Sequence, residues 1–209
     1  MAATPLSAVA LSFAAAGWWV DKGESLQDTI ATLASYEPDA LVIRSPHVGA
    51  AALVATWTGV CVINAGDGTH EHPTQALLDG FTLTRRIGRL DGRRIWIVGD
   101  VLHSRVARSN ILAFSKLGAH VTVCGPPTLI PPGIEALGCA VRYDLAELGE
   151  ADVVYALRMQ NERMQEDYVP SRHAYVSCYQ INAGRLGAHQ VLMHPGPVNR
   201  GVELSSDVA

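Results

Sequence analysis

Three arginines and a lysine stand where this chain could bind a small anion. Arg44, Arg105 and Arg158 each follow a run of apolar, β-branched residues, and Lys22 lies in a loop beside a glycine. A guanidinium group is always charged and binds a carboxylate or a phosphate through two parallel hydrogen bonds. Three arginines at equivalent places predict a small ligand with several negative charges. Each one alone could also be an ordinary surface residue that faces water.

A second group of chemically useful residues is His72-Pro73-Thr74-Gln75. Proline suits the first turn of a helix, so a helix is expected to begin here, with free amides that favour an anion or a polarised oxygen. His72 could donate a hydrogen bond to a carbonyl oxygen and stabilise charge that builds up during a reaction. Gln75, one turn along, could hold an amide group. A single histidine in a loop could equally have a structural role.

Other kinds of site have weaker support. His70 and His72 could begin a metal site, but no matching cluster of carboxylates or cysteines accompanies them. Gly99-Asp100 follows a strand-like run without a GxGxxG sequence, and neither a Walker A sequence nor a GxSxG elbow occurs. We therefore expect no metal and no organic cofactor.

The residues around these groups alternate between strand-like and helix-like patterns. Short apolar runs predict strands at 40–44, 60–64, 94–100, 120–124, 139–142, 152–157 and 190–193, of which the first is typical of a strand buried on both faces. Helical spacing predicts helices at 25–35, 73–87 and 106–117, with Gly118 ending the last. In the helix at 73–87, Ala76, Leu77, Phe81 and Thr84 are expected to share one face.

This alternation predicts an α/β fold with two lobes, each a mostly parallel sheet flanked by helices. The polar, glycine-containing stretch 85–92 places the border between the lobes near residue 88, and the polar stretch 160–187 is expected to be a loop over a site. In such sheets ligands bind beyond the carboxyl ends of the strands, where the arginines and His72 stand.

Composition limits the class of protein. Of 209 residues, 48% are hydrophobic and 17% charged, and the net charge of −4 offers no basic surface for nucleic acid. No run of about 18 uncharged apolar residues occurs, so no membrane association is expected. The four cysteines form no CxxC pair and are expected to be buried, reduced thiols of a cytoplasmic protein.

Several motifs in order along the chain resemble one enzyme family. They are Lys22-Gly23-Glu24-Ser25, Val42-Ile43-Arg44, the stretch 64–79 (NAGDGTHEHPTQALLD), Gly99-Asp100 with Ser104-Arg105-Val106-Ala107-Arg108-Ser109-Asn110, Leu157-Arg158-Met159-Gln160-Asn161-Glu162-Arg163, and Met193-His194-Pro195-Gly196-Pro197-Val198-Asn199-Arg200-Gly201. Together they resemble the catalytic chain of bacterial aspartate carbamoyltransferases over nearly the whole length, with a Rossmann-like, transcarbamoylase-like topology implied.

The resemblance implies an activity and partners. Such enzymes transfer the carbamoyl group of carbamoyl phosphate to L-aspartate in pyrimidine biosynthesis, without a metal or an organic cofactor. The family's active unit is a homotrimer, sometimes joined to regulatory or dihydroorotase-like chains. Residues 1–88 would form part of the carbamoyl-phosphate-binding domain, and 89–209 the aspartate-binding domain.

The resemblance also implies a role for each site residue. Arg44 would bind the phosphate, His72 would polarise the carbamoyl carbonyl, and Gln75 would hold the carbamoyl amide. Gly196 and Pro197 would contact the carbamoyl nitrogen through their backbone. The aspartate-binding residues would be Lys22, Arg105, Arg158 and Gln160, with Lys22 reaching a neighbouring subunit's site.

The chain also departs from the family pattern. The family's Ser-Thr-Arg-Thr phosphate loop is expected upstream of Met1, and its last helix beyond Ala209. Trp18 and Trp19 stand where the family has small serines. Two alternatives to aspartate carbamoyl transfer therefore stay open, a truncated non-catalytic homologue that keeps the fold and an ornithine carbamoyltransferase.

Overall fold

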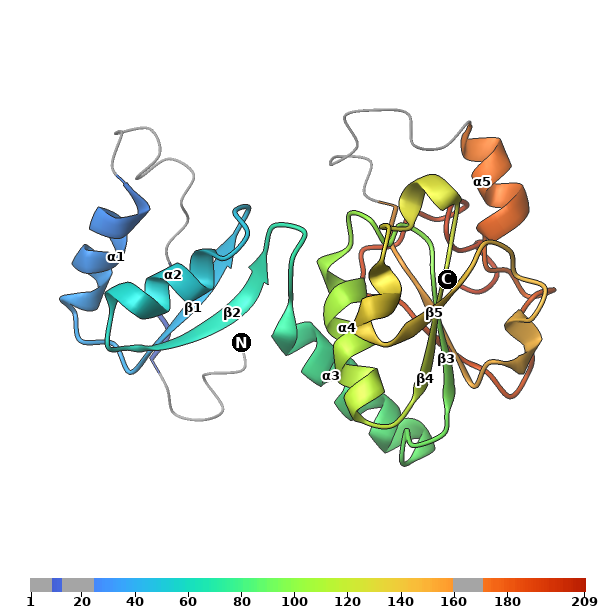
Figure 1. Cartoon of the computed structure of the whole chain (residues 1–209), viewed down its shortest axis with the longest axis horizontal. Helices are drawn as coiled ribbons and strands as arrows, with labels where there is room; N and C mark the ends of the chain where they lie inside the picture. Colours follow the sequence, from blue (N-terminus) through green and yellow to red (C-terminus); the bar gives the residue numbers. More distant parts are fainter. Residues whose placement is uncertain (1–8, 13–24, 160–170) are drawn as a thin grey trace. The chain divides into compact units, whose positions relative to one another are not determined.

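The computed structural model describes residues 9–12, 25–159 and 171–209. The chain divides into two compact units: the first holds residues 1–41 and 51–63, and the second holds 42–50 and 64–209. Helices separate the strands along the described chain, in the order α1 (Leu26–Ala34), β1 (Ala40–Ser45), α2 (Ala50–Trp57), β2 (Cys61–Asp67), α3 (Pro73–Ile87), β3 (Arg94–Val98), α4 (Arg105–Lys116), β4 (His120–Cys124), the short 3-10 helices η3 (Pro127–Leu129) and η4 (Ile134–Leu137), β5 (Cys139–Arg142), the 3-10 helix η5 (Leu148–Glu150), β6 (Val153–Ala156), α5 (Arg172–Tyr179) and β7 (Val191–Met193). The predicted α/β fold is confirmed (Figure 1).

Strands β1 and β2 form a two-stranded sheet. Exposed and half-buried residues alternate along β1, and Val42 is 66% exposed. The expectation that this strand is buried on both faces is therefore wrong for the described chain. The reason is that the apolar run predicts a strand but does not say how many neighbours cover it.

The second unit contains a five-stranded sheet in the order β5-β4-β3-β6-β7. All of its neighbouring strands run parallel, and Val98 at the end of β3 pairs with Cys124 of β4 and with Ala156 of β6. The carboxyl ends of these strands consequently lie along one edge of the sheet. From β3 the chain first adds β4 and β5 on one side of the sheet and then returns to add β6 and β7 on the other side. The strand order therefore reverses between β3 and β6.

Alternate side chains of the central strands enter two hydrophobic cores. Ile95, Ile97 and Tyr155 pack with Ile111 and Phe114 of α4. The neighbouring strand residues Trp96, Val98 and Val154 belong to the second core, together with Ile181 and Leu204 from the carboxyl-terminal part of the chain. Figure 1 shows α3 and α4 beside each other next to this sheet. These helices therefore fix the loops that precede them against the sheet edge.

Local sequence signals set the helix ends. Ser104 accepts a hydrogen bond from the Ala107 N–H and caps α4, and Gly118, at φ +85°, follows the end of that helix as predicted. Helix α3 begins at Pro73, and Gly88 follows it. Ser171 caps α5 in the same way as Ser104 caps α4.

The predicted buried face of α3 is wrong in part. Ala76 is buried, but Leu77 and Phe81 are 71% and 63% exposed, and the buried face also carries Asp79, Gly80 and Leu83. The helical spacing of the sequence favours the large apolar residues Leu77 and Phe81 for the inward face of α3. In the structure a buried carboxylate with three hydrogen bonds takes the inward position instead.

Two helices were not predicted. Helix α2 occupies an apolar stretch without clear periodicity, and α5 lies inside the stretch 160–187 that was expected to be a loop. Residues 160–170 of that stretch lie outside the described residues. Across the described parts of the chain, no helix has the length and apolar character required to cross a bilayer.

Candidate active site

Asp67 at the end of β2 organises the loop that leads to α3. Its carboxylate is almost fully buried and accepts hydrogen bonds from the side chain of Asn64 (3.0 Å) and from the backbone N–H groups of Gly49 (2.8 Å) and Glu71 (3.0 Å). His70 Nδ1 lies 3.0 Å from the same carboxylate. One side chain thus joins the loop after β1 to the loop after β2.

The hydrogen bonds keep Asp67 ionised. Burial by itself raises the pKa of this carboxyl, but the donors from Asn64, Gly49, His70 and Glu71 outweigh it and lower the pKa to about 2. Among the described residues, no three His, Cys, Asp or Glu side chains gather as a metal ion would require.

His72 directly precedes α3 and is held from two sides. Its backbone N–H donates to Ser109 Oγ of α4 at 2.8 Å, and its ring Nδ1 lies 3.1 Å from Thr74 Oγ1. If the Thr74 hydroxyl donates to Nδ1, the ring proton is on Nε2. His72 would then present an N–H donor on the side of the ring away from Thr74.

The charges around His72 favour its neutral form. Burial lowers its pKa below the usual 6.5, the positive charges of Arg105 and Arg44 lower it further, and Asp79 acts in the opposite direction. Two of the predicted arginines therefore lie close enough to act on the predicted histidine. Arg44 is an exposed residue near the end of β1, whereas His72 directly precedes α3 and Arg105 begins α4.

Arg105 lies against the backbone of the loop after β2. It is the first residue of α4, is only 7% exposed, and donates from Nη1 to the Gly68 carbonyl oxygen at 3.3 Å. Gly66 has φ +116°, and a Cβ atom there would lie 2.8 Å from Arg105 Cζ. A glycine at position 66 is needed for both the backbone conformation and the close approach of the guanidinium.

Gln75, in the first turn of α3, belongs to a buried polar network. Its Nε2 donates to Asp79 Oδ1 at 2.9 Å. The other oxygen of Asp79, Oδ2, accepts from Asn110 Nδ2 of α4 at 2.9 Å and from the Tyr155 hydroxyl of β6 at 2.7 Å. Burial and the neighbouring Asp79 charge raise the pKa of Tyr155, so its hydroxyl remains a donor.

Arg158 and the Gly196–Pro197 segment follow β6 and β7, at the same sheet edge as the loop between β3 and α4. Asn199 Nδ2 donates to the Met159 carbonyl oxygen at 3.1 Å and so ties the loop after β7 to the residue beyond Arg158. Arg158 is partly buried, and the peptide bond between Gly196 and Pro197 is cis.

The loop after β7 is closed by a buried histidine and a buried glutamate. The Gly196 N–H donates to His194 Nδ1 at 2.8 Å, which places the ring proton on Nε2, 3.3 Å from Glu203 Oε1. The same Glu203 oxygen accepts the Asn199 N–H. Residues 194 and 203 are thereby held together, and the segment that carries Gly196 and Pro197 lies between them.

Two predicted site residues, Lys22 and Gln160, lie outside the described residues, as do Trp18 and Trp19. Sequence reasoning assigned no role to Asp67, Asp79 or Ser109, which hold the predicted site residues in place. The only available signal was weak: Asp79 lies four residues after Gln75 and so on the same helix face.

Two family models together match most of the chain. Residues 1–85 match the family model "Aspartate/ornithine carbamoyltransferase, carbamoyl-P binding domain", and residues 91–209 match "Aspartate/ornithine carbamoyltransferase, Asp/Orn binding domain". The chain belongs to the aspartate/ornithine carbamoyltransferase family. The family resemblance expected from the sequence motifs is confirmed.

Similar proteins carry the name of one branch of this family. Aspartate carbamoyltransferase catalytic subunits from Acidothermus cellulolyticus and Myxococcus xanthus are 52% and 53% identical to all of this chain, which covers 66% and 72% of their lengths. A Trypanosoma cruzi aspartate transcarbamoylase in complex with N-(phosphonacetyl)-L-aspartic acid is 30% identical, with a TM-score of 0.85 over 99% of this chain and 69% of that one. The same enzyme in complex with carbamoyl phosphate and aspartate gives a TM-score of 0.84.

Proposed function

We propose that this chain transfers the carbamoyl group of carbamoyl phosphate to L-aspartate, giving N-carbamoyl-L-aspartate and phosphate for pyrimidine biosynthesis. The observation that supports this most is the placement of neutral His72 at the start of α3, under the positive charges of Arg44 and Arg105. Neutral imidazole suits a polarised carbonyl oxygen, and the arginines suit phosphate and carboxylate groups. The names of the similar proteins agree with this reaction.

In the proposed reaction the uncharged amine of aspartate attacks the carbamoyl carbon. A carbon–nitrogen bond forms, the carbon–oxygen bond to phosphate breaks, and the proton that the amine loses passes to the departing phosphate. His72 donates from Nε2 to the carbamoyl oxygen while negative charge builds up on it. This requires orientation and charge stabilisation rather than a covalent nucleophile on the enzyme.

The remaining residues are proposed to bind the two substrates. Arg44 binds the phosphate group, Gln75 binds the carbamoyl amide, and Gly196 and Pro197 contact its nitrogen through their backbone. Arg105 and Arg158 bind the carboxylates of aspartate, and Lys22 and Gln160 complete this site. The partly buried positions of Gln75 and Arg158 and the nearly complete burial of Arg105 favour defined contacts over free surface positions.

We further propose a cytoplasmic homotrimer. Free thiols in the described structure agree with a reducing compartment, although two of them, Cys61 and Cys178, are exposed rather than buried as expected. Cys124 and Cys139 are buried as expected. Analytical ultracentrifugation of the purified chain tests the oligomer, and a sedimentation coefficient of a monomer would contradict it.

The decisive experiment is an assay with two acceptors. Purified chain with carbamoyl phosphate should form carbamoyl-aspartate from aspartate and little product from ornithine. Titration calorimetry with N-(phosphonacetyl)-L-aspartate should give saturable heat. Product from ornithine alone would identify an ornithine carbamoyltransferase. Neither product nor heat at millimolar ligand would identify a non-catalytic homologue and overturn the proposal.

A further inference from the structure

Asp79 is a buried side chain whose two oxygens take part in a hydrogen-bond network. It is 4% exposed and accepts three hydrogen bonds, from Gln75, Asn110 and Tyr155. A buried polar group is costly unless it is hydrogen-bonded, so these three bonds stabilise Asp79 in this position. The donors come from α3, α4 and β6, so Asp79 joins the elements that support the candidate site.

The network determines which end of the Gln75 amide faces Asp79. Asp79 Oδ1 accepts a hydrogen bond from the NH2 group of Gln75, which turns the carbonyl oxygen of that amide, Oε1, away from Asp79. The side chain of Gln75 is thereby fixed as an acceptor toward whatever lies on its other side. Without Asp79, the two amide orientations would differ much less in energy.

We propose that Asp79 is a positioning residue that makes the enzyme select a carbamoyl group, because it presents Gln75 Oε1 to the NH2 group of carbamoyl phosphate. This rests on the proposed function, in which Gln75 binds that amide. An acetyl group has the same shape but carries a methyl group in place of NH2. It offers no donor to Gln75 Oε1, and a site built around a hydrogen bond rejects ligands that lack it.

The substitution Asp79→Asn tests this proposal, because an amide at position 79 should reverse the orientation of the Gln75 side chain. Asn110 and Tyr155 both donate at the Oδ2 position, so the oxygen of the new amide is favoured there and its NH2 group faces Gln75. Gln75 must then reverse to accept that hydrogen bond. Its own NH2 group would oppose the NH2 group of carbamoyl phosphate.

A second substitution restores the original orientation. In Asp79→Asn/Asn110→Asp, the carboxylate at position 110 accepts from the NH2 group of position 79, whose oxygen then faces Gln75 Nε2. The charge and composition of the network are unchanged. Tyr155→Phe is the matched control, because it removes one hydrogen bond from Asp79 but leaves the Gln75 bond in place.

The measurement is the ratio of the inhibition constant of acetyl phosphate to the KM of carbamoyl phosphate. We expect Asp79→Asn to lower this ratio by about 10- to 100-fold, the double variant to recover most of it, and Tyr155→Phe to keep it. An unchanged ratio in Asp79→Asn would overturn the proposal. So would an equal fall in Tyr155→Phe, since the effect would then be general loosening of the core.

A readout without catalysis separates this proposal from the proposed function. The side-chain NH2 protons of Gln75, assigned by their absence in Gln75→Leu, should exchange slowly with solvent in the wild type and rapidly in Asp79→Asn. If the wild type makes no carbamoyl product, the proposed function fails and the orientation by Asp79 is judged on exchange alone. Equal exchange rates of the Gln75 protons in the wild type and in Asp79→Asn would refute the proposed orientation of Gln75 by Asp79.

Discussion

His72 illustrates how individual side chains acquire their properties from their neighbours. Burial and the charges of Arg105 and Arg44 keep its pKa below the usual value, and Thr74 lies beside Nδ1. The residue type alone would have allowed an acid, a base, a metal ligand or a structural group. The surroundings favour a neutral donor directed by the first turn of α3.

Replacing His72 tests this role. His72→Ala should lower kcat for carbamoyl-aspartate formation by about 100- to 1000-fold, with a smaller change in KM, because a donor to the developing oxyanion is lost. Steady-state kinetics measure both constants. His120→Ala is the control, since His120 is exposed at the amino end of β4, away from the carboxyl-end loops. Wild-type turnover in His72→Ala would reject the assignment.

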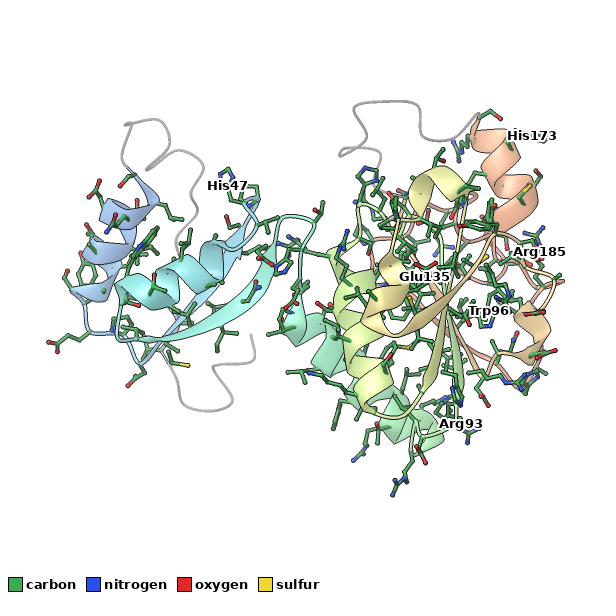
Figure 2. All side chains as sticks on the ribbon, in the orientation of Figure 1. His47, Arg93, Trp96, Glu135, His173 and Arg185 are labelled. Atoms are coloured by element: carbon green, nitrogen blue, oxygen red, sulfur yellow. The ribbon has the colours of Figure 1, made fainter. Side chains whose placement is uncertain are left out.

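The elements position these side chains through their ends. Figure 2 shows all side chains on the ribbon, with His47 labelled on the loop after β1 and Arg93 at the start of β3. Arg93, at the amino end, forms an ion pair with Asp152 at 2.8 Å, whereas Arg105, beyond the carboxyl end, donates to the Gly68 carbonyl oxygen and lowers the pKa of His72. The same residue type has a structural role at one end of the strands and belongs to the candidate site at the other.

The amino-terminal cap of α4 provides a prediction about such an end. Ser104→Ala removes the hydrogen bond from Ala107 N–H and should cost about 1 kcal/mol of stability. Because Arg105 is the next residue, the KM for aspartate should also rise. Ser171→Ala removes the equivalent cap of α5 and is the control. Its stability loss should be similar, and an equal rise in aspartate KM would show that the effect is not local to Arg105.

The loop after β7 provides a second prediction. Glu203→Ala leaves the Asn199 N–H without its buried acceptor and removes the carboxylate that lies 3.3 Å from His194 Nε2, so it should lower the free energy of unfolding by about 2 kcal/mol. Urea unfolding measures the change. Glu147→Ala, which removes an exposed ion pair with Arg142, should have almost no effect. If the two variants lose equal stability, Glu203 does not hold this loop.

At the scale of the whole molecule, the sequence predicted the larger sheet well. Runs such as 120–124 and 139–142 coincide with β4 and β5, because continuous branched apolar residues are characteristic of buried parallel strands. The buried face of α3 and helix α5 could not be predicted in this way. Leu77 and Phe81 look like core residues until the partners of Asp79 are known, and those partners lie 31 and 76 residues further along the chain.

Contacts between distant parts of the chain also limited the prediction of the candidate site. Arg44, His72 and Arg105 could be selected because their types and their places after strands carry chemical meaning. Asp67 and Ser109 could not, because their importance arises from hydrogen bonds to backbone atoms of other segments. The predicted boundary near residue 88 and the roles of Lys22 and Gln160 stay predictions.

Acid stability is a property of the whole molecule that Asp67 should dominate. Its folded pKa of about 2 is below the usual 3.8 of an aspartate, so its contribution is fully present above about pH 4 and is lost as the pH falls through 2. The size of the shift corresponds to about 2 kcal/mol. The pKa of Asp152 is also lowered: its hydrogen bonds from Arg94 and Arg93 outweigh its burial, and it therefore acts in the same direction.

Acid titrations of unfolding test this. Wild type should lose stability steeply between pH 4 and 2, and Asp67→Asn should be less stable at pH 7 but show a shallower loss on acidification. Asp39→Asn, at an exposed carboxylate, serves as the control. Parallel titration curves for wild type and Asp67→Asn would show that Asp67 does not gain stability from its ionised form.

The shared anchor at Asp67 also constrains how this protein can be re-engineered. Its two oxygens hold Gly49 and Glu71, which belong to different connections of the chain. A chimaera that imports only one of these connections from a relative would leave the carboxylate facing a mismatched backbone. Both connections should therefore be exchanged as a pair, so that Gly49 and Glu71 keep their places around the Asp67 carboxylate.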